Sequence, residues 1–378
     1  MLIPNNKQST RLFQLAGAAR FAYNWALGYE NANHEAGNKF VPGSELRKIF
    51  TQLKSKNPEF NWLNDISNNV TKQAIKDANT AFGNFFAGRT DFPQFKSKRK
   101  TRPAFYMDTD KIQFTDTHVK LEKLTTSLKK NKQKFNWVRL AEHDRIPLNA
   151  KYYNPRVTFD GLNWWISVGI ECEEDSTVPT NPGIGIDLGI KTLAKCSDTN
   201  EYPNINKSNK VKRLEKRKRR LQRKGSRKYT KTKKGDKYCK TRNIIKSEKK
   251  LLVLNHRLTN IRHDHLHNAT TEIVNRKPKF IVMEDLNVSG MMKNKHLSKS
   301  AQEQCFGEFY RQIEYKSKFN NIEFITADRY YPSSKMCSCC GNIKKDLKLS
   351  ERTYRCDKCG LVIDRDFNAS INLSRYSR

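Results

Sequence analysis

Two C-x-x-C pairs near the end of the sequence constrain the fold of this chain more than any other feature. Cys337 and Cys340 form the first pair, Cys356 and Cys359 form the second, and 15 residues separate the two pairs. This spacing is typical of a Zn²⁺ site in which two tight turns each supply two thiolate ligands. Because four cysteine ligands leave no open coordination position, zinc bound here would be structural.

A third cysteine, Cys339, offers a second possible register for the first pair. Cys340 and Cys359 are each followed by glycine, at Gly341 and Gly360, and glycine eases the tight turn of a metal knuckle. A register based on Cys339 lacks this symmetry, so the sequence favours Cys340 as the ligand. The alternative is a set of buried or oxidisable free thiols.

The net charge restricts the partners that such a chain can have. Lys and Arg number 73 against 38 Asp and Glu, which gives a net charge of +35. Such an excess favours a nucleic-acid partner, because each neutralised phosphate releases counterions, and an anionic membrane is the rival. The sequence has no run of 18 apolar residues and no N-terminal signal pattern, so we expect a soluble protein that is not secreted by the usual route.

The first half of the chain changes from a helical to a strand-like pattern. Apolar residues at helical spacing predict a helical region over 9–90, with Ser9 or Thr10 as the first cap. Residues 104–175 alternate as strands do, and an Asp160-Gly161 turn predicts a hairpin in a β-rich module such as a small barrel. In that hairpin Trp164 and Trp165 point to opposite sides, so one belongs to the core and the other could stack on a base.

The second half has α/β organisation interrupted by the cysteine module. From Gly183 an apolar strand, a glycine turn and a second strand precede a basic segment, Lys207–Lys250, with 22 Lys or Arg and three acids. The Gly- and Ser-containing middle of this segment, residues 224–237, could be a solvated, disordered arm, but in either form it would bind phosphates. The residues that we expect to contact nucleic acid are Lys212, Arg213, Lys216, Arg217, Arg220, Arg223 and Lys224.

Acids end two of the predicted buried strands. Asp187 follows the apolar run GIGI and Glu284 follows FIVM, while Asp364 and Asp366 come just after the cysteine module. A carboxylate at the end of an apolar strand is costly unless it is hydrogen-bonded or coordinated. Each acid alone could be a cap or a turn residue, but three carboxylates at one sheet edge can hold two Mg²⁺ or Mn²⁺ ions for phosphodiester cleavage.

His263 and His267 lie four residues apart on one predicted helix, a spacing that also occurs in zinc sites. No further ligand motif accompanies them, so we favour contact with nucleic acid or solvent over a metal.

Five motifs in order resemble those of one family. They are GIDLGIK, VMEDLNV, YPSSKMCSCCG, RCDKCG and DRDFNASINL, and segments upstream resemble its N-terminal part. In these motifs the chain resembles the TnpB family, transposon-encoded RNA-guided nucleases related to the type V CRISPR effectors.

The resemblance implies a role for each acid and a fold. Asp187, Glu284 and Asp366 would be the catalytic, Mg²⁺- or Mn²⁺-binding residues, and Asp364 would be a neighbour that pairs with a base. The fold would be multidomain α/β, with a RuvC/RNase H-like nuclease domain that contains a zinc-ribbon insertion. An N-terminal β module would carry an inserted helical recognition subdomain.

The resemblance also implies domain limits. We expect the start of the β (wedge-like) module at 1–8, the helical recognition subdomain at 9–100, the remaining β module at 101–180, the RuvC-like domain with its basic helical insertion at 181–335, the zinc ribbon at 336–360 and the last RuvC segment at 361–378.

The implied activity is that of an RNA-guided DNA endonuclease in the cytoplasm of a prokaryotic cell. Its cofactors would be Mg²⁺ or Mn²⁺, one structural Zn²⁺ and a guide RNA, and its substrate would be duplex DNA beside a short motif. No membrane partner is expected, and a monomer is the simplest oligomeric state. Two other functions stay open: an RNA-guided repressor that does not cleave, and a transposase or recombinase accessory protein.

Overall fold

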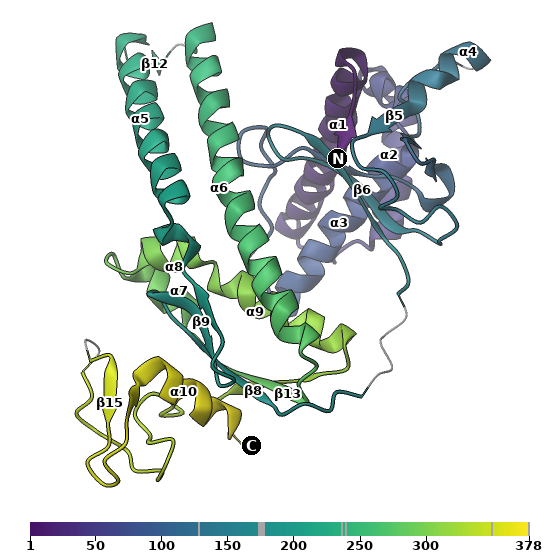
Figure 1. Ribbon diagram of the computed structural model, residues 1–378. Helices are drawn as coiled ribbons and strands as arrows, with labels where there is room; N and C mark the ends of the chain where they lie inside the picture. The colour runs from purple at the N-terminus through teal and green to yellow at the C-terminus, as the bar shows by residue number, and fades with distance from the viewer. Residues whose placement is uncertain (128, 173–177, 236, 239, 349–350, 377–378) are drawn as a thin grey trace. The chain divides into compact units, whose positions relative to one another are not determined.

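The computed structural model describes residues 1–127, 129–172, 178–235, 237–238, 240–348 and 351–376. The chain divides into two compact units, Met1–Cys172 and Glu173–Arg378 (Figure 1). The linker-like stretch at 173–182 begins at residues outside the described ranges. No described helix is both long and apolar enough to cross a bilayer.

The first unit contains a seven-stranded antiparallel sheet in the order β2-β6-β7-β1-β5-β4-β3. Alternating side chains of its longer strands are buried, which agrees with the alternation in the sequence. The strands are β1 (Leu2–Ile3), β2 (Ala104–Tyr106), β3 (Gln113–Phe114), β4 (His118–Lys120), β5 (Trp137–Leu140), β6 (Tyr153–Phe159) and β7 (Trp164–Gly169).

Strand β1 joins the two halves of this sheet although it has only two residues. Leu2 is buried and pairs with Leu140 of β5 on one side and with Trp164 of β7 on the other. Helix α1 (Asn6–Glu35) follows it, and the amide of Gln8 donates to the backbone oxygens of Phe135 and Trp137 at 3.0 and 2.9 Å. The first residues therefore anchor both the sheet and the first helix.

Helices cover residues 6–86 of the first unit. The predicted cap at Ser9 or Thr10 is wrong, because Asn5 caps α1: its side chain accepts from Gln8 N, and the Gln8 side chain accepts from Asn5 N. The other helical segments are α2 (Gly43–Lys56), η1 (Pro58–Asp65), α3 (Asn68–Phe86), η2 (Thr109–Lys111), α4 (Lys130–Gln133) and η3 (Lys134–Asn136).

The predicted hairpin is formed by β6 and β7. The carboxylate of Asp160 accepts from the backbone of Leu162 and Asn163, and Gly161 has φ +101°. Trp164 is buried in the core, whereas Trp165 is exposed and donates to Asp160 at 2.6 Å.

The second unit is built on a five-stranded sheet in the order β10-β9-β8-β13-β14. Strands β8, β13 and β14 are parallel, and β9 runs antiparallel to β8 and to β10. The strands are β8 (Ile184–Leu188), β9 (Thr192–Cys196), β10 (Glu201–Pro203), β13 (Phe280–Glu284) and β14 (Glu323–Ala327).

Helices pack on both faces of this sheet (Figure 1). On one face, Ile186 and Met283 join a core with residues of α6, α8 and α9, while on the other face Val282 packs with Leu373 of α10. The remaining elements are η4 (Ile205–Lys207), α5 (Asn209–Lys231), β11 (Lys233–Lys234), β12 (Lys237–Tyr238), α6 (Arg242–Asn275), α7 (Val288–Lys293), α8 (Ser298–Gln304), α9 (Phe306–Phe319), β15 (Thr353–Arg355), β16 (Val362–Asp364) and α10 (Arg365–Ser374).

Residues 301–319 belong to two helices. Cys305 has φ +55° and separates α8 from α9, so the helical hydrogen-bond ladder stops there. Phe306, Phe309 and Ile313 of α9 are buried.

Candidate functional site

Asp187 and Glu284 lie side by side at the carboxyl ends of two parallel strands. Ile281 pairs with Ile184 and Met283 pairs with Ile186, so the same register places Glu284 next to Asp187. Side chains alternate along a strand, and therefore both acids point to the face of Val282, which α10 covers. The two carboxylates share one face and one edge of the sheet.

Helix α10 approaches this face closely because β8 carries a glycine there. A Cβ atom built at Gly185 would lie 2.1 Å from Ser370 O and 2.3 Å from Ser374 N. A side chain at this position would force the helix away, which explains a glycine inside a buried strand. The first turn of α10 carries Asp366 and brings it to the edge where Asp187 ends its strand.

The electrostatics of Asp187 indicate that the acids are neighbours. Burial raises the pKa of Asp187 well above its usual range, and the negative charges of Asp366 and Glu284 raise it further. Burial and the adjacent Asp285 also raise the pKa of Glu284. A bound cation would relieve this repulsion, so the donor set suits a hard divalent ion.

Two arginines form ion pairs with Asp366. Arg365 lies 3.2 Å and Arg352 3.6 Å from its carboxylate oxygens. Among the described residues, the four cysteines form a group whose ligand atoms all lie within 4.8 Å of one another, and the three acids do not. The acids therefore share one edge of the sheet at a wider spacing than the cysteines.

Asp364 makes different contacts from Asp366. It is the N-cap of α10, accepting from Phe367 N at 2.9 Å, and it pairs with Lys195 at 3.2 Å. Burial opposes ionisation of Asp364, but these two donors outweigh it and lower its pKa. The expected pairing of Asp364 with a base is thus present.

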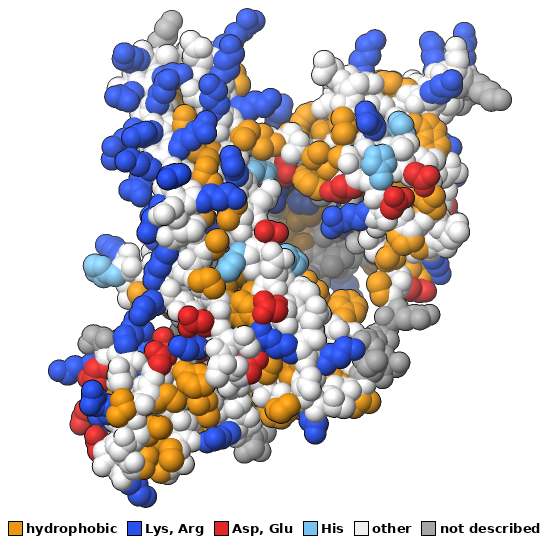
Figure 2. Space-filling view, viewed as in Figure 1, with side chains coloured by type: hydrophobic (Ala, Val, Ile, Leu, Met, Phe, Trp, Pro, Cys, Tyr) orange, Lys and Arg blue, Asp and Glu red, His pale blue; other side chains and the backbone are white. Residues whose placement is uncertain are grey.

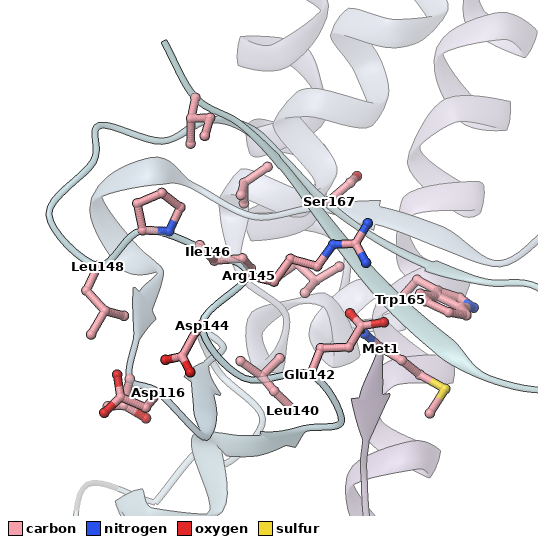
Figure 3. Close-up of a pocket in the computed structure, with 15 residues that line it drawn as sticks. Met1, Asp116, Leu140, Glu142, Asp144, Arg145, Ile146, Leu148, Trp165 and Ser167 are labelled. Atoms are coloured by element: carbon pink, nitrogen blue, oxygen red, sulfur yellow. The ribbon is translucent and has the colours of Figure 1, made fainter. Parts of the chain in front are cut away.

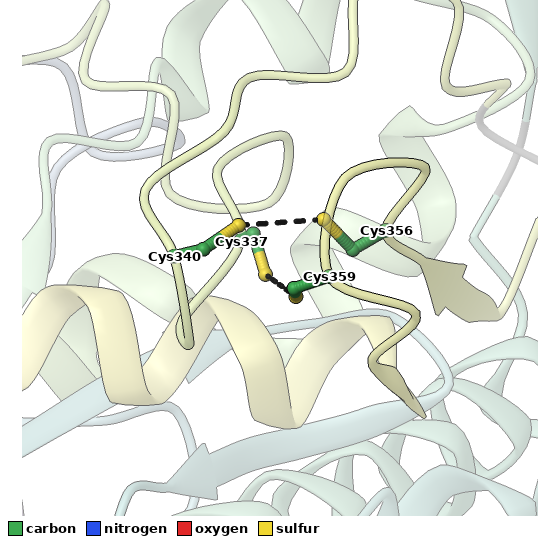
Figure 4. A group of neighbouring side chains, drawn as sticks. All are labelled: Cys337, Cys340, Cys356 and Cys359. Carbon is green, nitrogen blue, oxygen red and sulfur yellow. Dashed lines mark hydrogen bonds between the residues drawn. The ribbon is translucent and has the colours of Figure 1, made fainter.

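The four predicted zinc ligands meet in one cluster (Figure 4). The sulfurs of Cys337 and Cys359 are 3.6 Å apart, those of Cys340 and Cys356 are 3.5 Å apart, and all four lie within 4.8 Å of one another. A tetrahedron with Zn–S bonds of about 2.3 Å has sulfurs about 3.8 Å apart, so the cluster fits zinc. Cys339 is exposed and lies outside the cluster.

The two glycines have the conformation that the knuckles require. Gly341 and Gly360 have φ +72° and +74°, a region that favours glycine. Gly341 N donates to Cys337 O at 2.9 Å and Gly360 N donates to Cys356 O at 3.0 Å, which closes each turn. The choice of Cys340 over Cys339 thus agrees with the turn geometry.

Two buried asparagines bind α10 to the first knuckle. Asn368 accepts from Ser338 N at 2.9 Å and donates to Met336 O at 2.7 Å. Asn372 donates to Ser333 O and again to Met336 O, at 2.7 and 2.6 Å. The helix that carries Asp366 is therefore fastened directly to the cysteine module.

The basic segment forms a helical hairpin of α5 and α6. Val211, Leu214, Leu254 and Leu258 make its small core, and α5 continues to Lys231 through most of the part that could have been a solvated arm. Figure 2 shows Lys and Arg gathered over these two helices. All seven predicted nucleic-acid contacts are exposed: Lys212, Arg213, Lys216, Arg217, Arg220, Arg223 and Lys224. A shallow hollow in α5 is lined by Arg219, Arg220, Arg223 and Arg227 together with Gln222 and Ser226.

His263 and His267 belong to no metal-type cluster among the described residues. Burial and the nearby Lys316 lower the pKa of His267, and Lys316 donates to the His267 backbone oxygen at 3.0 Å.

A cavity of about 600 Å³ lies in the first unit beside the exposed Trp165 (Figure 3). Its lining is mixed: apolar residues such as Ile146 and Leu148 lie beside the charged side chains of Asp116, Glu142, Asp144 and Arg145, and the N-terminal ammonium group of Met1 pairs with Glu142 at 3.0 Å. Carboxylates outnumber cations in this lining, which disfavours a nucleic-acid backbone.

Sequence reasoning missed the residues that position the acids. Lys195, Arg352 and Arg365 contact Asp364 or Asp366, and Gly185 admits α10. Only Gly185 had a sequence signal, because glycine inside an apolar strand often marks the close approach of another backbone.

Fold and site together define an α/β protein with a four-cysteine module, which fits zinc, next to an acidic strand edge. Three family descriptions match parts of the chain: "Helix-turn-helix domain" at residues 1–39, "Probable transposase" at 167–295 and "Cas12f1-like, TNB domain" at 306–373. Residues 1–39 contain a short strand and one 30-residue helix rather than a helix-turn-helix.

Two relatives match over nearly the whole length of this chain, and a third matches over part of it. "Putative RNA-guided DNA endonuclease InsQ" of Escherichia coli K12 is 30% identical over 388 residues, covering 98% of this chain and 90% of that protein. A "Putative RNA-guided DNA endonuclease" of Streptomyces pristinaespiralis is 29% identical, covering 98% and 86%. "TnpB-like protein MJ0751" of Methanocaldococcus jannaschii is 32% identical over 30% of this chain and 42% of that protein. The chain belongs to the TnpB family.

A solved structure shares the fold. The protein in the cryo-EM structure of a Cas12f1-sgRNA-target DNA complex has a TM-score of 0.59 at 15% sequence identity, covering 97% of this chain and 82% of that chain.

Proposed function

We propose that this protein is an RNA-guided DNA endonuclease with a RuvC-type centre at Asp187, Glu284 and Asp366. The observation that carries the proposal is the placement of Asp187 and Glu284 in register at one sheet edge, with the first turn of α10 beside them. Membership of the TnpB family and the names of the full-length relatives support it.

The acids suit the hydrolysis of a phosphodiester. Two divalent ions held by these carboxylates would activate a water molecule and stabilise the leaving oxygen. The protein holds Asp187 and Glu284 rigidly on adjacent strands, while Asp366 comes from a helix fastened at Gly185 and Asn368. The four cysteines would bind one structural zinc that fixes the module beside α10.

The basic hairpin supplies affinity for the polyanion. Exposed Lys and Arg on α5 would contact phosphates of the guide RNA or of its duplex with the target strand, without reading sequence. The helices at 9–100 and the β module at 1–8 and 101–180 would bind guide RNA and read a short duplex motif. Base pairing with the guide would then select the target.

The decisive experiment purifies the chain with its bound RNA. We expect absorbance at 260 nm in excess of the protein's own, and sequencing of that RNA gives the guide. The complex with Mg²⁺ should cut a matched duplex that carries a randomised flank, and alanine at Asp187, Glu284 or Asp366 should abolish cutting while DNA binding persists. A matched duplex that stays intact contradicts the proposal.

The phosphate contacts have their own test. Arg220→Ala should lower the slope of log affinity against log salt by about 1, because one phosphate contact is lost. The control is Lys299→Ala, which removes an exposed positive charge from α8. Lys299 pairs with Glu303 there, and its removal should leave the slope unchanged. Equal slopes for Arg220→Ala and the parent would remove Arg220 from the interface.

Two alternatives have defined signatures. A repressor would bind the matched duplex in the presence of Mg²⁺ and leave it intact. A transposase or recombinase accessory protein, which the family description "Probable transposase" favours, would promote strand joining and carry no guide RNA.

A further inference from the structure

Lys195 lies between two acids next to the proposed metal centre. Its ammonium group is 3.2 Å from Asp364 and 3.4 Å from Glu201, and only 20% of its side chain is exposed. Burial alone would lower the pKa of Lys195, but the two carboxylates outweigh this and raise it. The side chains of Asp364 and Glu201 are 45% and 59% exposed, so the ammonium group is shielded from solvent while its two partners are partly solvated.

The strand register puts Lys195 directly opposite Asp187. The two residues are partners in the antiparallel pairing of β8 with β9, so their side chains leave the same face of the sheet. The ammonium group nevertheless contacts Asp364 and Glu201. Lys195 thus links the strand beside Asp187 to the start of α10.

Asp364 connects Lys195 to the helical turn that carries Asp366. Its carboxylate caps α10 by accepting from Phe367 N at 2.9 Å, and Asp366 follows in the first helical turn. The start of the helix is therefore held from β9, while its later turns are held by Gly185 and Asn368. Asp364 also ends β16, which pairs with β15, so without the Lys195 contact the first turn keeps its cap and this strand pairing but loses the ion pair to β9.

We propose that Lys195 is a positioning residue for the metal centre, which acts through Asp364 to hold Asp366 beside Asp187. This inference rests on the proposed function, since it assumes that these acids bind divalent ions. Residues that orient metal ligands typically change metal affinity about 10- to 100-fold when they are mutated. We expect the lower end, about tenfold weaker affinity, because Lys195 acts through another residue.

The variants separate the ion pair from the helix cap. Lys195→Met keeps the aliphatic stem and removes the charge, and Lys195→Arg keeps the charge. Asp364→Asn removes the charge but retains a good N-cap. The matched control is Lys344→Met, because Lys344 is 23% exposed and pairs with Asp357 at 3.4 Å in the cysteine module.

Two measurements report on metal affinity with different sources of error. The first is the rise in melting temperature of the full-length chain on titration with Mn²⁺, which follows from preferential binding to the folded state. The second is the Mg²⁺ concentration that gives half-maximal cutting by the complex with its guide RNA. Melting without added Mn²⁺ shows whether a variant is folded.

We expect Lys195→Met and Asp364→Asn each to need about tenfold more metal in both assays, with maximal cutting at saturating Mg²⁺ close to the parent. Lys195→Arg should restore most of the affinity, and Lys344→Met should match the parent. The double variant Lys195→Met/Asp364→Asn should be no worse than either single variant, because both remove one link.

Unchanged or tighter metal binding by Lys195→Met would overturn the inference, as would effects of the two single variants that simply add. Asp187→Ala distinguishes this failure from failure of the proposed function. If Asp187→Ala does not reduce the Mn²⁺-dependent rise, the acids are not a metal centre and the proposed function fails. If Asp187→Ala reduces the rise and Lys195→Met does not, only the role of Lys195 is refuted.

Discussion

The cysteine cluster and the acidic strand edge are two candidate metal sites built in opposite ways. The cysteine ligands lie within 23 residues of sequence, on two turns that hold four sulfurs within 4.8 Å of one another. The acids come from two strands and a helix far apart in the chain, and burial, followed by the charges of Asp366 and Glu284, raises the pKa of Asp187. The difference teaches that the first site is built from local turns, whereas the second depends on the surrounding fold to hold charges that repel one another.

Asp366→Ala tests the acidic side of this comparison and has the largest expected effect. Removing a carboxylate that holds the ions should lower the cutting rate by about 10³-fold or more, at the scale of a lost transition-state contact. DNA binding should persist. The matched variant is Asp364→Asn, which should cut at a rate close to that of the parent at saturating Mg²⁺. The reverse ranking of the two variants would assign the metal to Asp364.

Cys356→Ser tests the cysteine side. Zinc binding provides on the order of 10 kcal/mol in isolated zinc fingers, so loss of one ligand should unfold the module locally. Hydrogen exchange should then show lost protection over 333–364, together with reduced cutting because α10 loses its partner. Cys339→Ser is the control, since Cys339 is exposed and outside the cluster. Equal effects of the two substitutions would reopen the choice of ligands.

Asn368→Ala tests the connection between the two sites. It removes a buried side chain that bonds Ser338 N and Met336 O, and unsatisfied buried groups cost about 1–3 kcal/mol each. We expect a lower melting temperature and a weaker response to Mg²⁺. Asn320→Ala, at the end of α9, should change neither the metal response nor cutting. A normal Mg²⁺ response in Asn368→Ala would show that the two sites are independent.

Asp187→Asn tests how burial and the neighbouring negative charges at Asp187 affect the stability of the fold, and its expected effect on stability is the smallest of the series. The folded, Mg²⁺-free protein binds a proton at Asp187 more tightly than the unfolded chain, so its stability falls as pH rises from about 4 through the raised pKa. Because asparagine does not ionise, Asp187→Asn removes this loss of stability at high pH. At pH 8, without added Mg²⁺, each kcal/mol relieved should raise the melting temperature by roughly 2–4 °C.

The pH series supplies the control for this variant. At pH below about 4, where Asp187 is protonated in both states, Asp187→Asn and the parent should melt alike. A destabilised Asp187→Asn at pH 8 would show that the carboxylate is stabilised rather than strained in the absence of Mg²⁺.

Much of what could be predicted follows from short, local patterns in the sequence. The cysteine ligands follow from spacing and from glycines at positive φ, and the two strand-end acids follow from apolar runs that end in a carboxylate. The hairpin at Asp160 and the helices of the basic segment have equally local signals. Each of these depends on neighbours a few residues away.

What failed or was missed depends on contacts that sequence does not record. Lys195 and Asp364 are far apart in the chain, and nothing in their surroundings marks them as partners. Asn5 outcompetes Ser9 as a cap because Gln8 completes a reciprocal pair of hydrogen bonds. The break at Cys305 comes at a cysteine with φ +55°, where the sequence has neither glycine nor proline to mark it.

The parallel register of β8 and β13 has a consequence for how such proteins can change in length. Three short windows, around residues 187, 284 and 366, carry the acids. The sheet aligns the first two, and α10, packed against Gly185, brings the third to the same face. Insertions or deletions between these windows can therefore enlarge or trim the nucleic-acid-binding parts while the spacing of the acids stays constant. A centre of this kind is free to acquire new partners without rebuilding its chemistry.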